Sequence, residues 1–100
     1  MKSKLDILQA SVRISKFIRK TYFYYSSVFS NNINSKVWFK SENLQYTGSF
    51  KVRGAFNKLL KLSLSDRKKG ILAASTGNHG AAIAYAAKAL NTSCTIFVPE

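Results

Sequence analysis

An amphipathic pattern opens the chain between Leu5 and Ile18. Apolar residues recur there largely at steps of three and four, and basic residues occupy many of the positions between them. This spacing gathers apolar side chains on one face of a helix. We therefore expect one amphipathic helix, with attachment of that helix to a membrane surface as a competing interpretation.

The pattern changes after Thr21. Aromatic residues at 22–25 predict a short extended piece, and the turn-forming residues from Ser26 to Ser35 predict an irregular connector. Short apolar runs then alternate with helical patterns. The expected strands lie at 37–40, 71–74 and 94–98, and the expected helices at about 49–62 and 80–90.

Short connections join these expected elements. Ser65 and Asp66 are suited to cap one further helical turn, which Gly70 would end. The helix over 49–62 presents an apolar face made of Phe50, Ala55, Phe56, Leu59 and Leu60. Strand, helix, strand, helix, strand with short connections predicts right-handed crossovers and a parallel sheet. The fold class is therefore α/β, with ligands expected at the carboxyl ends of the strands.

Composition agrees with a folded domain. The chain has 100 residues, of which 46% are hydrophobic and 13% aromatic, which is enough to build a core. The formal net charge of +12 attracts anions and raises a different class of function, a basic module that binds nucleic acid or a membrane surface. The charges are scattered and no aromatic-and-basic repeat accompanies them, so we expect no specific nucleic-acid recognition and no membrane partner.

The single cysteine, Cys94, cannot form a disulfide within the chain and fits a reducing, cytoplasmic location. It stands in a strand-like run, where it is expected to be a small buried apolar residue. No apolar run approaches the roughly 20 residues that span a bilayer. The Gly-x-Gly-x-x-Gly dinucleotide fingerprint and the Walker loop are also missing, which argues against a nicotinamide enzyme.

Lys51 carries the most distinctive chemistry. Thr47, Gly48 and Ser49 form a turn that leads into a helical pattern, so Lys51 falls where a helix should begin. The partial positive charge of a helix N-terminus disfavours a second positive charge on an ammonium. A lysine kept partly neutral can form a Schiff base with an aldehyde.

A second polar block, Ser75-Thr76-Gly77-Asn78-His79, follows an expected strand and precedes an expected helix. Its backbone N–H groups and hydroxyls would converge on an anion, and a substrate carboxylate is the natural candidate. His79 would support the loop rather than transfer protons.

Two long motifs resemble those of one enzyme family. Glu-Asn-Leu-Gln-Tyr-Thr-Gly-Ser-Phe-Lys-Val-Arg-Gly-Ala at 42–55 and Ala-Ala-Ser-Thr-Gly-Asn-His-Gly at 73–80 are similar to the cofactor-lysine and substrate-carboxylate motifs of the threonine/serine dehydratase and serine racemase family. The segment from Asp6 to Thr21 is weakly similar to that family's opening helix. One departure is Tyr22, where relatives usually carry a proline.

The resemblance implies a tryptophan synthase beta-like α/β fold and pyridoxal 5'-phosphate as cofactor. Residues 1–100 would form the N-terminal part of the enzyme domain, without the phosphate-binding loop and therefore inactive alone. Lys51 would hold the cofactor and remove the Cα proton, with Phe50 beside the ring, Asn78 on the ring hydroxyl and Arg53 as a structural ion-pair partner. The expected reaction is α,β-elimination of L-threonine or L-serine to a 2-oxo acid and ammonia, as in isoleucine biosynthesis, by a homo-oligomer.

Serine racemisation is the alternative within the family. It needs an acid on the face of the carbanion opposite Lys51. The racemases that the chain resembles carry a hydroxyl residue at the position of Thr76, where many dehydratases have alanine. A threonine hydroxyl is a weak acid without a partner, so elimination is favoured.

Overall fold

The computed structural model describes residues 3–100. Its helices are α1 (Lys4–Ile14), α2 (Ser27–Asn32), α3 (Lys51–Lys61), α4 (Leu64–Lys68) and α5 (Asn78–Ala89). Its strands are β1 (Phe23–Tyr25), β2 (Trp38–Lys40), β3 (Ile71–Ala74) and β4 (Cys94–Phe97), and two 3-10 turns, η1 (Glu42–Leu44) and η2 (Tyr46–Gly48), precede α3. The mixture of helices with a parallel strand pair confirms the α/β class.

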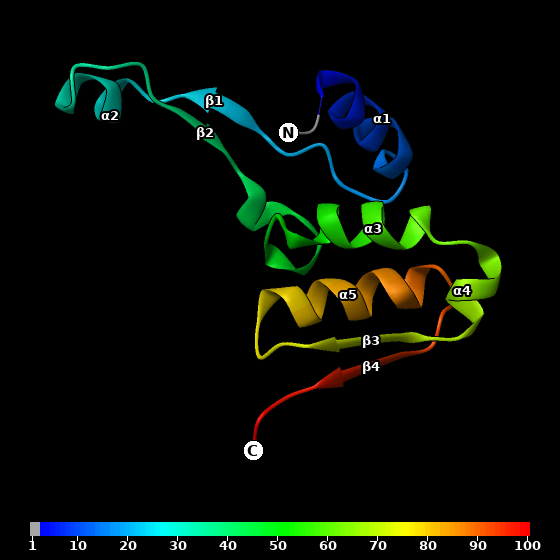
Figure 1. Ribbon diagram of the computed structural model, residues 1–100. Helices are drawn as coiled ribbons and strands as arrows, with labels where there is room; N and C mark the ends of the chain where they lie inside the picture. The colour runs from blue at the N-terminus through cyan, green and yellow to red at the C-terminus, as the bar shows by residue number, and fades with distance from the viewer. Residues whose placement is uncertain (1–2) are drawn as a thin grey trace.

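The elements stack in layers around α3 and α5. Figure 1 shows α5 between α3 and the strand pair β3–β4, with α1 on the other side of α3. The parallel register pairs Ile71 with Cys94 and Ala74 with Phe97. Both strands therefore end at the same edge, where α5 begins.

The core lies between the helices because α3 contributes large side chains and α5 small ones. Val52, Phe56 and Leu59 of α3 are at most 1% exposed. The facing residues of α5 include Ala82 and Ala86, both fully buried, and alanine lets the two helices approach closely. The alanine-rich sequence of α5 thus has a packing role, as expected.

The first expected strand does not belong to the parallel sheet. Residues 38–40 pair antiparallel with β1, so β2 and β1 form a separate two-stranded ribbon. The prediction of a three-stranded parallel sheet is wrong for this strand. The ribbon and α2 make an arm (residues 22–40) that extends away from the layers in Figure 1.

Aromatic stacking holds the two strands of the arm together. Trp38 stacks on Phe23 with ring centroids 5.3 Å apart and meets Tyr25 edge-on at 5.4 Å. On the other face, Phe39 contacts Tyr24 and Phe29. These rings contact one another and yet remain exposed, because no other layer covers the arm in the described part of the chain.

The connector expected over 26–35 contains the helix α2. Ser26 caps it, because its hydroxyl accepts a hydrogen bond from the Phe29 N–H at 3.4 Å. The buried Ser30 hydroxyl donates to the Ser26 carbonyl at 2.6 Å and accepts from the Val37 N–H at 2.9 Å. Serine and asparagine favour turns in isolation, but here the hydroxyls satisfy backbone groups of a short helix.

Several helix ends differ from expectation. The first helix stops at Ile14, and Phe17 turns back to stack on Phe56 at 4.9 Å. Ser63, instead of Ser65, caps α4 by accepting from the Asp66 N–H at 3.0 Å. Asn91 closes α5 with a φ of 53°, as predicted.

Two individual side chains also bear on the predictions. Phe50 is 60% exposed instead of lying on the buried face of α3. Cys94 is half-buried against the core, consistent with its expected apolar role. None of the helices in residues 3–100 is long and apolar enough to cross a membrane.

Two glycines allow a matched test of the packing between α5 and the strands. A Cβ on buried Gly80 would lie 3.2 Å from both the Ile96 Cγ2 and the Ser75 carbonyl oxygen, whereas a Cβ on Gly54 meets nothing within 4 Å. We expect Gly80→Ala to lower the free energy of unfolding by about 1–3 kcal/mol through overpacking. Gly54→Ala should raise it by up to about 1 kcal/mol because alanine is the better helix former. Denaturant titration followed by circular dichroism measures both, and equal effects would contradict this packing.

Candidate active site

Lys51 is the first residue of α3, as the sequence predicts. Its backbone N–H donates to the Ser49 hydroxyl at 3.4 Å, and the Lys51 side chain is exposed. The ammonium nitrogen lies 5.2 Å from the centroid of the Phe50 ring. No carboxylate in the described residues pairs with this ammonium, so it is a free, accessible amine.

A strained turn sets the direction of the chain before Lys51. Thr47 and Gly48 both adopt the left-handed conformation, with φ of 63° and 71°. Glycine tolerates this region, but a β-branched threonine does so only when its surroundings enforce it. The neighbouring Tyr46 ring supplies one such constraint, because it stacks on Tyr85 of α5 at 5.3 Å.

Gln45 fixes the other end of this turn. It is 3% exposed, and its side-chain amide pairs with the backbone of Arg19. The Arg19 N–H donates to Gln45 Oε1 and the Gln45 Nε2 donates to the Arg19 carbonyl, both at 2.9 Å. This double hydrogen bond fastens the turn to the segment that follows α1.

An ion pair connects the turn to α3. Arg53 donates from Nε to Glu42 Oε2 at 2.8 Å and from Nη2 to Glu42 Oε1 at 2.6 Å. Thr21 adds a third hydrogen bond to the same carboxylate at 2.6 Å. The hydrogen bonds from Arg53 lower the pKa of Glu42 to about 2, against the opposing effect of burial. The structural role predicted for Arg53 is therefore confirmed.

The loop of residues 75–79 lies at the start of α5. The Ser75 hydroxyl accepts hydrogen bonds from the Gly77 N–H at 3.3 Å and the Gly80 N–H at 3.0 Å. The helix begins at Asn78, two residues earlier than expected. The backbone N–H groups of Thr76, Asn78 and His79 have no partner within residues 3–100, so they are free to bind an anion.

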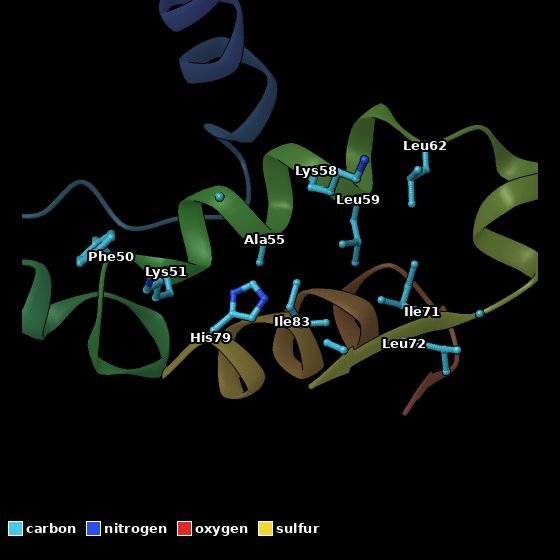
Figure 2. A pocket seen from close by; sticks show the side chains of 13 residues that line it. Phe50, Lys51, Ala55, Lys58, Leu59, Leu62, Ile71, Leu72, His79 and Ile83 are labelled. Carbon is cyan, nitrogen blue, oxygen red and sulfur yellow. The ribbon is translucent and has the colours of Figure 1, made fainter. Parts of the chain in front are cut away.

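A cavity of about 640 Å³ is lined by residues of α3, β3 and α5 and of the segments that join α3 to β3. In Figure 2 Lys51 and His79 lie near one another towards one end, and apolar side chains and Lys58 line the remainder. The lining residues are Phe50, Lys51, Gly54, Ala55, Lys58, Leu59, Leu62, Gly70, Ile71, Leu72, Ala73, His79 and Ile83. Of the predicted site residues, Phe50, Lys51 and His79 line this cavity, whereas Ser75, Thr76, Gly77 and Asn78 do not.

The fold and site together define a class: an α/β protein with an unpaired lysine at one helix N-terminus and a loop with free backbone N–H groups at another. A family profile described as "Pyridoxal-phosphate dependent enzyme" matches residues 14–100. The chain therefore belongs to the pyridoxal-phosphate-dependent enzyme family, and it has the fold of the type II members of that group.

Individual relatives include both lyases and racemases. The chain is 45% identical to L-threo-3-hydroxyaspartate ammonia-lyase of Saccharomyces cerevisiae and 44% identical to L-threonine ammonia-lyase of Thermotoga maritima, over 95% of this chain in each case. These alignments cover 29% and 24% of the two relatives, so the chain spans less than a third of their length.

A solved structure of a relative has the same fold as this chain. The crystal structure of serine racemase from Dictyostelium discoideum superposes with a TM-score of 0.90 at 43% identity. The superposition covers 96% of this chain and 31% of that one. The fold is therefore shared over almost the whole of this chain.

The residues near Lys51 fit the cofactor of this family. Pyridoxal phosphate is a flat ring with an aldehyde, and it needs a free primary amine beside an apolar wall. The unpaired Lys51 ammonium, the exposed Phe50 ring and the cavity next to them meet that need.

Sequence reasoning missed the residues that brace the turn. Glu42 and Gln45 both lie inside the quoted motif, but no periodicity marks their partners Thr21 and Arg19, which are more than 20 residues away. The composition did contain a signal for Glu42. The chain has only four acidic residues against sixteen basic ones, so each carboxylate has many possible cationic partners.

The ion pair predicts a pH dependence of stability. Because the folded-state pKa of Glu42 is lowered from 4.5 to about 2, its stabilisation is complete above pH 4.5 and is lost as the pH falls to about 2. The loss should reach up to about 3 kcal/mol. The free energy of unfolding, measured between about pH 6 and pH 2, checks this prediction. Glu42→Gln should be less stable than the parent at about pH 6 and as stable as the parent at about pH 2. A constant difference across this range would contradict the assignment.

Proposed function

We propose that the whole protein is a pyridoxal-phosphate-dependent ammonia-lyase that converts L-threonine or L-serine to a 2-oxo acid and ammonia. The observation that carries this proposal is the pairing of two helix starts: the unpaired Lys51 amino group at the start of α3, and the free N–H groups of Thr76, Asn78 and His79 at the start of α5. Two of the relatives are named ammonia-lyases, which supports the same reaction type.

Three residues would hold the cofactor. Lys51 would bond to its aldehyde carbon, Phe50 would lie beside its ring, and Asn78 would hydrogen-bond to its ring hydroxyl. When bound, pyridoxal phosphate supplies an electron-withdrawing ring that stabilises negative charge at the substrate Cα.

The substrate would be held by its carboxylate. Ser75, Thr76, Gly77, Asn78 and His79 form the loop, and its free N–H groups would bind both carboxylate oxygens with the help of the helix N-terminus. The substrate's amine would take the place of Lys51 on the cofactor, and the Lys51 amine released in this way would take the Cα proton. Loss of the β-hydroxyl as water leaves an enamine, which takes up water to give the 2-oxo acid and ammonia.

We infer a small amino acid as the substrate, a cytoplasmic location and a homo-oligomer in the whole protein. Threonine as the substrate would suit isoleucine biosynthesis.

Lys51→Ala tests the central assignment. The whole protein reconstituted with pyridoxal phosphate should show the visible absorbance of a lysine-bound cofactor, and the variant should lose it. Dehydration should fall by about a thousandfold or more, because both the attachment point and the base are removed.

Lys58→Ala is the matched control, because Lys58 lines the same cavity two helical turns further along α3. It should keep the absorbance. Borohydride reduction followed by peptide mapping should place the cofactor on Lys51, and recovery of the label on another lysine would overturn the assignment.

Serine racemisation is a second candidate, favoured by the exposed Thr76 in the carboxylate loop and by the similarity to serine racemases. A racemase needs a proton donor opposite Lys51, and the Thr76 hydroxyl is the candidate group. An unassisted threonine hydroxyl is a weak acid, so we place elimination first.

Thr76→Ala separates the two reactions. Dehydration of L-serine should stay within about an order of magnitude, because Lys51 and the backbone donors remain. Any formation of D-serine should disappear. D-serine formed by the parent as fast as the 2-oxo acid, and lost selectively in Thr76→Ala, would reverse our order of the two activities.

A further inference from the structure

A second cavity, of about 380 Å³, has a very different lining from the one beside Lys51. It lies where the end of α1 and the segment after it meet the end of β2 and the first turns of α3. Figure 1 shows α1 next to α3. Four of its seven lining residues are cationic, and two more are serines. The lining consists of Ser11, Ser15, Ile18, Arg19, Lys20, Lys40 and Arg53.

The positive charge of this basic cavity is mostly uncompensated. Two of the four acidic residues of the chain are engaged elsewhere, Asp6 in the cap of α1 and Asp66 in the cap of α4. Glu100 is the last residue. Only Glu42 reaches a cation of the cavity within the described residues, through its ion pair with Arg53. One carboxylate against four cations leaves three positive charges without a counter-ion.

Hydrogen-bond donors also remain unused. Lys40 gives one bond to the Thr21 carbonyl at 2.8 Å, which leaves two ammonium N–H groups. Arg53 directs Nε and Nη2 at Glu42 and keeps Nη1 free. The ammonium of Lys20 has no partner in residues 3–100. A cavity with spare charge and spare donors is suited to an oxyanion.

We propose that this basic cavity binds the phosphate group of a small molecule. A phosphate carries up to two negative charges and three or four acceptor oxygens, which match the two lysine ammoniums and the free Nη1 of Arg53 better than a single carboxylate does. The cavity is larger than one phosphate group, so it has room for an organic part. The cations surround a concavity instead of forming a stripe, which favours a small ligand over a nucleic-acid backbone.

The basic cavity is separate from the proposed active site. The two cavities share no lining residue. They meet only through α3, because Arg53 stands two residues after Lys51. The phosphate proposal therefore does not depend on the proposed lyase activity, and it can be tested without the cofactor.

Calorimetric titration with glycerol 3-phosphate at moderate salt tests the proposal. The double variant Lys20→Gln/Lys40→Gln should bind about tenfold more weakly than the parent, which corresponds to the loss of charge-assisted hydrogen bonds. The control, Lys4→Gln/Lys88→Gln, removes the same charge from exposed positions outside the cavity and should change binding less than about twofold. Inorganic phosphate, titrated in parallel, shows whether the organic part contributes.

Equal weakening in the two double variants would overturn the proposal, because it would mean unspecific attraction by the net charge. A short single-stranded DNA that binds more tightly than glycerol 3-phosphate, and loses affinity in the cavity variant, would also overturn it in favour of nucleic acid. If the loss of the Lys40 bond to Thr21 unfolds the double variant, the same titration of the single variant Lys20→Gln tests the proposal. It should weaken glycerol 3-phosphate binding about threefold or more, and an unchanged affinity would contradict the proposal.

Discussion

The packing of α3 against α5 is the constraint on which the candidate active site depends. Lys51 is the first residue of α3 and Asn78 is the first residue of α5, so each of the two candidate loops lies at the N-terminus of one helix. The fit of Phe56 and Leu59 against the alanines of α5 sets the distance between the helices. The positions of the Lys51 amino group and of the loop before α5 thus follow from the core instead of from contacts between the loops.

A polar network outside the core completes this arrangement. Glu42 joins the turn after β2 to α3 through Arg53 and to the segment after α1 through Thr21. Gln45 ties the same turn to Arg19. These bonds hold a turn that contains a threonine in the left-handed conformation, which would relax without them. Local strain before Lys51 is therefore balanced by long-range hydrogen bonds.

Sequence reasoning succeeded where local signals decide the structure. The Thr-Gly-Ser turn before Lys51, the alanines of α5 and Asn91 at its end all act within a few residues, and their elements appear where expected. It failed for 38–40, because a three-residue strand is too short for its own pattern to select a partner. It also missed Glu42 and Thr21 as the partners that complete the Arg53 cluster, and it missed the basic cavity, since folding alone brings these distant residues together.

The aromatic arm has a consequence for spectroscopy. Trp38 is the only tryptophan of the chain. It stacks on Phe23 and meets Tyr25 edge-on, in an arm that extends away from the packed helices. Two-stranded ribbons are marginally stable by themselves. Tryptophan fluorescence therefore reports the pairing of β1 with β2, whereas circular dichroism follows mainly the helices. The two signals observe different parts of one molecule, and their midpoints coincide only if the arm and the layers unfold together.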